Sequence, residues 1–161
     1  SNCIEWNEYS YDFSIEKLEE KYTIKYNDKG RQIEKNKHHL NGNIAIKIIY
    51  KYDDNGNITT KEEIIFNSDS SVNQKSIYML NDKGKIIEGR DYSKEKLDYK
   101  YEWKYDDKGS LIEATAHNAV GRMVSKEKYK YTYDNIDNWV QKIKYKNNIV
   151  KYNKIRNFYN C

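Results

Sequence analysis

Proline is absent from this 161-residue sequence, and cysteine and histidine are scarce, with two and three residues respectively. A chain of this length would carry about 8 prolines at the usual frequency, so nothing forces a kink or a polyproline segment. The scarce residues are Cys3, Cys161, His38, His39 and His117. They are too few and too scattered to complete a zinc site. We therefore expect neither a metal nor a cofactor.

The acidic residues lack a catalytic pattern. The pairs Asp53-Asp54 and Asp106-Asp107 fall in predicted turns. Glu62 and Glu63 are consecutive in a predicted strand, so their side chains point to opposite faces. Because no acid, base and nucleophile come together, we expect that the protein is not an enzyme.

Charge is nearly balanced, with 29 basic and 25 acidic residues and a formal net charge of +4. This balance argues against a dedicated nucleic-acid binder, and nucleic acid is the partner that we expect least. From Asn138 onward there are six lysines or arginines and no acid. A solvated basic strand face explains this run more simply than a site for an anionic ligand.

A turn signal of the form Tyr-(Asp/Asn)-Asp-x-Gly recurs along the chain. It is clear at Tyr26–Gly30, Tyr52–Gly56 and Tyr105–Gly109, and weaker at Leu80–Gly84 and Tyr133–Asp137. Its last position returns at intervals of 26, 28, 25 and 28 residues, and such a period indicates a repeat protein. We expect one domain over residues 1–161, with repeat turns near 27–30, 53–56, 81–84, 106–109 and 134–137.

Each repeat predicts a β-hairpin. Residues 44–52 alternate with period two, Asp53 can cap a type I turn, and Gly56 supplies the positive φ of a bulged turn. Weaker turns between the repeats complete an all-β, up-and-down antiparallel meander of about 11–12 strands. The strands are expected near 4–11, 20–26, 31–39, 43–52, 57–66, 74–80, 85–92, 97–105, 110–117, 122–133, 138–146 and 149–159. A short helix over Ser14–Lys21 is an alternative for that segment.

Twelve strands about 4.8 Å apart would span more than roughly 50 Å if flat, and open sheets of this size usually curl. We therefore expect a curled sheet or a wide, partly closed barrel. Aromatic residues alternate in the first arm of each hairpin, as in Tyr101, Trp103 and Tyr105. We expect this aromatic face to be the concave core and the Lys/Glu face to be solvated. Because tyrosine supplies 17 residues, the core hydroxyls need water or polar partners.

The motifs YKYDDNGN, IKYNDKGR, WKYDDKGS and YTYDNIDN resemble the YD repeats of RHS-type bacterial surface and toxin-delivery proteins. The ending YTYDNIDNWVQKIKY looks like the segment that closes short secreted Bacteroidetes proteins of this type. The resemblance covers roughly residues 20–159 and implies an extracytoplasmic β-repeat structure without chemistry of its own. The chain is shorter than the toxin-enclosing shells of long RHS proteins, so a stand-alone binding role is the expectation.

The two cysteines allow three readings. A Cys3–Cys161 disulfide would close a long loop, worth up to ~5 kcal/mol. Alternatively, Cys3 is the lipid-bearing first residue of a mature lipoprotein, or both thiols are inert. The first two readings favour an extracytoplasmic location, in the periplasm, on the outer membrane or secreted. We expect contact with a membrane only through a lipid on Cys3.

The aromatic residues indicate binding, because tyrosine and tryptophan beside lysine suit protein partners and sugars alike. We expect a protein partner, with the chain acting as an adaptor or as a toxin-neutralising immunity protein. A glycan-binding protein or a purely structural surface repeat is the alternative. The densest aromatic segment supplies the candidate binding residues Tyr101, Trp103, Tyr105, Tyr131, Tyr133 and Trp139.

Overall fold

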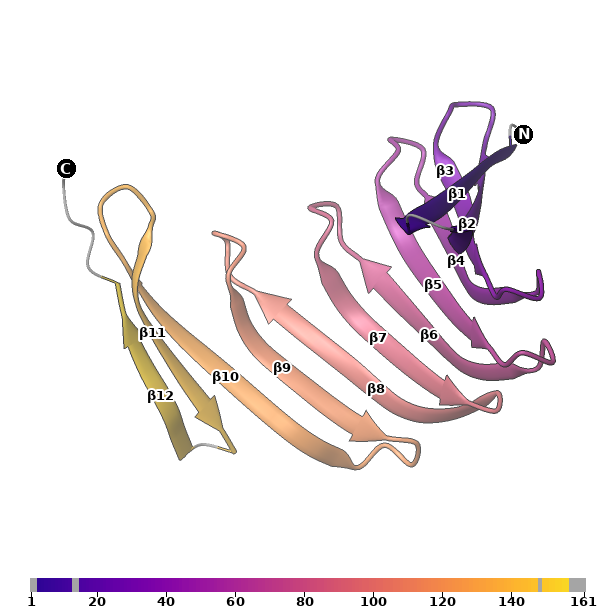
Figure 1. The fold of residues 1–161 in the computed structure, drawn as a ribbon. Helices are drawn as coiled ribbons and strands as arrows, with labels where there is room; N and C mark the ends of the chain where they lie inside the picture. Colours follow the sequence, from indigo (N-terminus) through magenta and orange to yellow (C-terminus); the bar gives the residue numbers. More distant parts are fainter. Residues whose placement is uncertain (1–2, 13–14, 148, 157–161) are drawn as a thin grey trace. The chain divides into compact units, whose positions relative to one another are not determined.

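The computed structural model describes residues 3–12, 15–147 and 149–156, and every regular element in them is a β-strand (Figure 1). The strands are β1 (Cys3–Asp12), β2 (Ile15–Tyr26), β3 (Gln32–His38), β4 (Ile44–Tyr52), β5 (Ile58–Phe66), β6 (Val72–Leu80), β7 (Ile86–Ser93), β8 (Lys96–Tyr105), β9 (Leu111–Asn118), β10 (Met123–Tyr133), β11 (Trp139–Lys146) and β12 (Ile149–Ile155). The predicted all-β meander is confirmed.

The helix considered over Ser14–Lys21 is wrong for the residues that the structure describes there. Ile15–Tyr26 is a single strand, whose residues Ile15 to Lys25 are paired antiparallel with β1. A helix would need the same backbone groups for its own hydrogen bonds. Pairing with the neighbouring strand therefore overrides the local helical pattern of Glu, Lys and Leu.

The hydrogen-bonded strand order follows the chain from β1 to β12. Within the described ranges, β1 and β12 each have one strand neighbour, so the sheet is not closed, and the barrel alternative is wrong. Short turns bring each strand beside the next one in sequence, and none of these connections joins the two ends.

The turns are built as the repeat predicts. The amide of Asp53 donates to the carbonyl of Asn57 (3.0 Å), the amide of Gly56 donates to Asp53 (3.1 Å), and the Asp53 carboxylate accepts the Asn57 amide (2.8 Å). The last residue of each of the five repeat turns has a positive φ; these residues are Gly30, Gly56, Gly84, Gly109 and Asp137. Glycine enters this region without a steric cost, and aspartate does so more readily than most residues.

The chain is organised as two compact units, which we call the N-terminal unit (Ser1–Asp98) and the C-terminal unit (Tyr99–Cys161). The single domain over residues 1–161 and its curl remain predictions.

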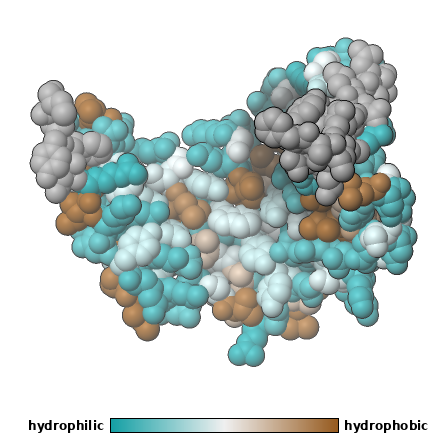
Figure 2. All heavy atoms as spheres, viewed as in Figure 1, coloured by the Kyte–Doolittle hydropathy of each residue, from teal (hydrophilic) through white to brown (hydrophobic). Residues whose placement is uncertain are grey.

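The expected aromatic core is absent from the described part of the chain, where no hydrophobic side chain is buried. The buried polar side chains are Asn36 and Thr115, which are 4% and 9% exposed. Apolar residues form separate spots among hydrophilic ones on the face shown in Figure 2. The physical reason is that each unit is a single layer of strands, so neither face is covered by a second sheet or a helix.

Candidate functional site

The first aromatic cluster lies on β8. Tyr99, Tyr101 and Trp103 occupy alternate positions and therefore share one face of the strand. Ring centroids are 6.2 Å apart between Tyr99 and Tyr101 and 5.8 Å apart between Tyr101 and Trp103. The Tyr99 side chain is 43% exposed, and the other two are half-buried. The rings thus form a continuous row that keeps contact with solvent.

The second aromatic cluster joins β10 to β11. The ring of Tyr131 lies 6.0 Å from that of Tyr133 and meets that of Trp139 edge-on at 6.4 Å. A bulge makes this contact: Thr132 pairs with Gln141, whereas Tyr133 pairs with Trp139. The extra residue on β11 turns Trp139 to the same face as Tyr131.

Alanines separate the two clusters. Tyr101 pairs with Ala116, and Trp103 pairs with Ala114, which in turn pairs with Glu127 on β10. Because β9 lies between β8 and β10, the two aromatic rows are about 10 Å apart at normal strand spacing. The six candidate residues therefore form two groups with small side chains between them. We call this surface the aromatic face of the C-terminal unit.

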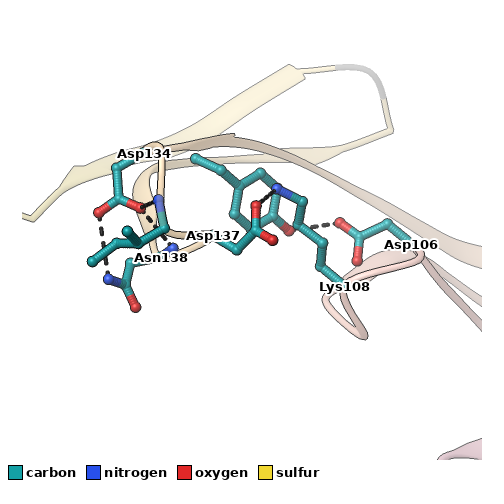
Figure 3. A network of polar contacts seen from close by, with 7 residues as sticks. Asp106, Lys108, Asp134, Asp137 and Asn138 are labelled. Carbon is teal, nitrogen blue, oxygen red and sulfur yellow. Dashed lines mark hydrogen bonds and ion pairs between the residues drawn. The ribbon is translucent and has the colours of Figure 1, made fainter.

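One of the candidate residues, Tyr133, is tied to the neighbouring repeat turn by its contacts. The Tyr133 hydroxyl donates to the Asp106 carboxylate (2.6 Å). The Lys108 ammonium lies 4.2 Å from the centre of the Tyr133 ring and pairs with Asp137 (Figure 3). Burial, followed by the bond to Asp106, raises the pKa of Tyr133. Burial also raises the pKa of Tyr105. Tyr133 thus links two successive repeat turns.

Cations complete the aromatic face, and sequence reasoning did not place them there. The Lys142 ammonium lies 4.8 Å from the ring centre of Tyr129 and 5.4 Å from that of Tyr131. The Arg156 guanidinium lies 3.5 Å from the ring centre of Trp139. These distances are within the range of cation–π attraction. The basic run after Asn138 was visible in the sequence, but its pairing with β10 tyrosines depends on the strand register.

Glu127 is the acid of this face. It pairs with Lys144 (2.9 Å) and accepts the Tyr129 hydroxyl (2.7 Å). The bond from Lys144, then that from Tyr129, lowers the pKa of Glu127. Burial, then the bond to Glu127, raises the pKa of Tyr129. Glu127 is therefore held as a carboxylate by Lys144 and Tyr129.

The opposite face of β9 carries a charged row. Glu113 bridges Lys104 (3.0 Å) and Lys126 (2.9 Å) on the two neighbouring strands. Hydrogen bonds from Lys126 and then Lys104 lower the pKa of Glu113 to about 2. We call the face that carries Glu113 the charged face of the C-terminal unit.

The N-terminal unit repeats this bridge. Glu34 pairs with Lys25 (2.9 Å) and Lys47 (3.0 Å), and Asn36 donates to it (2.9 Å). Burial would raise the pKa of Glu34, but the bonds from Asn36, Lys25 and Lys47 outweigh it and lower the pKa to about 2. The bridge is therefore a property of the repeat and not of one site.

Each unit also has a hollow. The hollow in the C-terminal unit has a volume of about 450 Å³ and is lined by Lys104, Ile112, Glu113, Lys128, Tyr129, Lys130 and Tyr145. The hollow in the N-terminal unit has a volume of about 420 Å³ and is lined by Ile64, Val72, Lys75, Ile77, Tyr92 and Glu95. Both volumes are in the range of ligand pockets.

The residues set aside as non-catalytic have structural contacts. Asp53 and Asp106 accept backbone amides of their own turns. The His38 ring contacts Thr23 at 3.1 Å and the Gly42 carbonyl at 3.0 Å. No cluster of metal-ligating side chains occurs in the portion that the structure describes, and that portion contains no helix able to cross a membrane. The Cys3–Cys161 disulfide stays a prediction, because Cys161 lies outside the described residues.

The fold has a counterpart in a solved toxin structure, although no protein-family model and no curated protein matches the chain. The chain is similar to part of a Photorhabdus luminescens Tc holotoxin pore that carries a TccC3 mutation, with a TM-score of 0.52 and 16% identity. The match covers 94% of this chain but 8% of the toxin chain. At this identity the likeness shows the fold alone, and it is consistent with YD-type repeats.

Proposed function

We propose that this chain is a non-catalytic, extracytoplasmic binding module that engages a protein partner, as an adaptor or a toxin-neutralising protein does. The observation that carries the proposal is the aromatic face of the C-terminal unit. Its rings lie on a single-layer sheet, where they are half-buried by their own neighbours and still reach solvent.

The chemistry of this face fits a protein interface. Tyrosine, tryptophan and arginine are the residue types that contribute most binding energy at such interfaces. The contacts of Tyr101 with Trp103 and of Arg156 with Trp139 hold these groups in place before binding. Holding them in place lowers the entropic cost of forming a complex.

Two observations support the proposed location and family. The recurring Tyr-x-Tyr-Asp turns resemble the YD repeats of secreted bacterial proteins, and the solved counterpart of the fold is a toxin complex. We infer a YD-repeat protein that acts outside the cytoplasm.

The test uses the proteins encoded beside this gene, each titrated against the full chain by calorimetry. The variants Tyr101→Ser/Trp103→Ser and Tyr131→Ser/Trp139→Ser should each weaken binding by about tenfold or more, or about 1.4 kcal/mol. The matched control is Tyr50→Ser/Tyr78→Ser on the N-terminal unit, which should change affinity less than about twofold. Circular dichroism checks that each variant folds. Equal affinities for all variants would contradict the proposal.

A further inference from the structure

Equivalent rows of side chains cross the two units. In the N-terminal unit, strand register aligns Lys25, Glu34, Ile49 and Glu62 from β2 to β5. In the C-terminal unit the same register aligns Lys104, Glu113, Lys128 and Tyr145 from β8 to β11. Directly paired residues point to the same face of a sheet. The rows begin with the same Lys and Glu and then differ in their last two positions.

The difference changes the charge balance. The N-terminal row contains a second acid, Glu62, which pairs with Lys75 at 2.6 Å. The C-terminal row has Tyr145 in that place and a lysine, Lys128, where the other unit has Ile49. The next lysine along β10, Lys130, holds its ammonium 5.7 Å from the ring centre of Tyr145. Glu113 is therefore the single carboxylate in a row that it shares with Lys104 and Lys128.

That carboxylate is already occupied. One oxygen of Glu113 pairs with Lys104, and the other pairs with Lys126. Lys128 and Lys130 are exposed, and neither has a carboxylate within 4 Å among the residues that the structure describes. Both line the hollow of about 450 Å³, together with Lys104, Glu113 and Tyr145, which share their face, and with Ile112 and Tyr129.

We propose that this hollow binds an acidic segment of a protein partner. Glutamate or aspartate side chains of that segment pair with Lys128 and Lys130, and a neighbouring apolar side chain packs on the ring of Tyr145. The one acid in the lining, Glu113, is engaged by Lys104 and Lys126, so the charge left for a ligand is positive and favours an acidic segment. The inference rests on the proposed function in taking the ligand to be a protein segment, but the residues that it invokes, Lys128, Lys130 and Tyr145, lie on the charged face.

The test is a fluorescence anisotropy titration of the full chain with a labelled peptide, Gly-Glu-Leu-Glu-Leu-Glu-Glu-Phe-Gly. The same peptide with glutamine in place of every glutamate is the ligand control. The acidic peptide should bind about tenfold or more tightly than its glutamine counterpart, and binding should weaken as salt is raised, because ionic screening reduces each charge pair. The variant Lys128→Gln/Lys130→Gln should lose about tenfold in affinity.

Two further variants separate this site from general charge and from folding. Lys51→Gln/Lys83→Gln removes the same charge from exposed positions of the N-terminal unit and should change affinity less than about twofold. Lys128→Ile/Tyr145→Glu rebuilds the row found in the N-terminal unit and should abolish binding in a chain that still folds. Unchanged binding by Lys128→Gln/Lys130→Gln would overturn the proposal.

The remaining outcomes distinguish the two faces and the two ligand classes. Tyr101→Ser/Trp103→Ser should leave peptide binding intact, so loss of partner binding in that variant concerns only the proposed function. Peptide binding that depends on Lys128 and Lys130 would support the hollow as a binding site. If the aromatic variants nevertheless bind protein partners normally, the proposed role of the aromatic face would be wrong. A heparin octasaccharide that binds through these lysines where the peptide does not would overturn the assignment to a protein segment.

Discussion

The two units share a backbone plan and differ in the chemistry of their faces. The Lys–Glu–Lys bridge forms around Glu34 in one unit and around Glu113 in the other. Yet residues 1–98 carry 16 basic and 18 acidic residues, whereas residues 99–161 carry 13 and 7. Turns and alternation set the strands, and side chains that do not serve the turns are free to acquire a binding role.

The aromatic rows show the same contrast. In the N-terminal unit Lys61 lies between two tyrosines, paired with Tyr50 on one side and Tyr78 on the other, and its ammonium is 5.9 Å from the Tyr78 ring centre. In the C-terminal unit Ala114 and Ala116 occupy the corresponding strand beside Trp103 and Tyr101. The four rings are all half-buried, and under the proposed function the short alanine side chains leave room for a partner beside the C-terminal rings.

The largest expected effect comes from the turns, where the units should behave alike. Gly56 and Gly109 have φ of 94° and 77°, a region in which a β-branched residue is strained by about 1–3 kcal/mol. Gly56→Val and Gly109→Val should each lower the free energy of unfolding in urea by about 2 kcal/mol. A side chain at position 56 would also meet the guanidinium group of Arg31, but this is the end of a flexible side chain that can move aside. A neutral result at both positions would refute the turn geometry.

The Glu bridges should have a smaller and matched effect. The Glu113 side chain is 17% exposed, but its partners Lys104 and Lys126 are 66% and 34% exposed, so water screens the pairs. Glu34→Gln and Glu113→Gln should each lower stability by about 1 kcal/mol. Urea denaturation measures both. If one substitution costs several kcal/mol and the other nothing, the two bridges are not equivalent.

The bridges also predict a pH dependence. The pKa of Glu113 falls from its ordinary value of 4.5 to about 2 in the folded chain, so the folded state binds this proton more weakly than the unfolded state. The contribution of Glu113 is complete above pH 4.5 and is lost as pH falls toward 2. The stability difference between the native chain and Glu113→Gln, measured in urea, should therefore shrink between about pH 5 and 2. A constant difference would contradict the lowered pKa.

The smallest expected effect is at Asp137, which ends the one repeat turn of the five whose last residue is not glycine. Its φ is 65°, so Asp137→Gly relieves a modest strain. The substitution also removes the exposed ion pair with Lys108, worth about 0.2–1 kcal/mol. These effects oppose each other, and thermal unfolding should show a net change below about 0.5 kcal/mol. A large loss of stability would mean that Lys108 and Asp137 hold the turn together.

The strands were predictable because Tyr52, Asp53 and Gly56 mark a turn by their own chemistry, and the same signal recurs. The ring contact of Tyr131 with Trp139 was not predictable, because it depends on a bulge that only the register reveals. The absence of a buried core among the described residues could not be predicted either. Apolar and polar residues alternate along a strand in the same way whether the sheet is a single layer or is covered by a second one. At Ile15–Lys21, a pattern compatible with a helix became a strand because β1 pairs along the segment, and β3 joins it at Lys21.

Oxidative footprinting of tyrosine and tryptophan, with and without a bound partner, tests most directly whether the aromatic face of the C-terminal unit is the binding surface. The rings of Tyr101, Trp103, Tyr131 and Trp139 should become protected when the partner binds, while those of Tyr50 and Tyr78 keep their reactivity. Protection confined to Tyr50 and Tyr78, with the four C-terminal rings unchanged, would contradict the account.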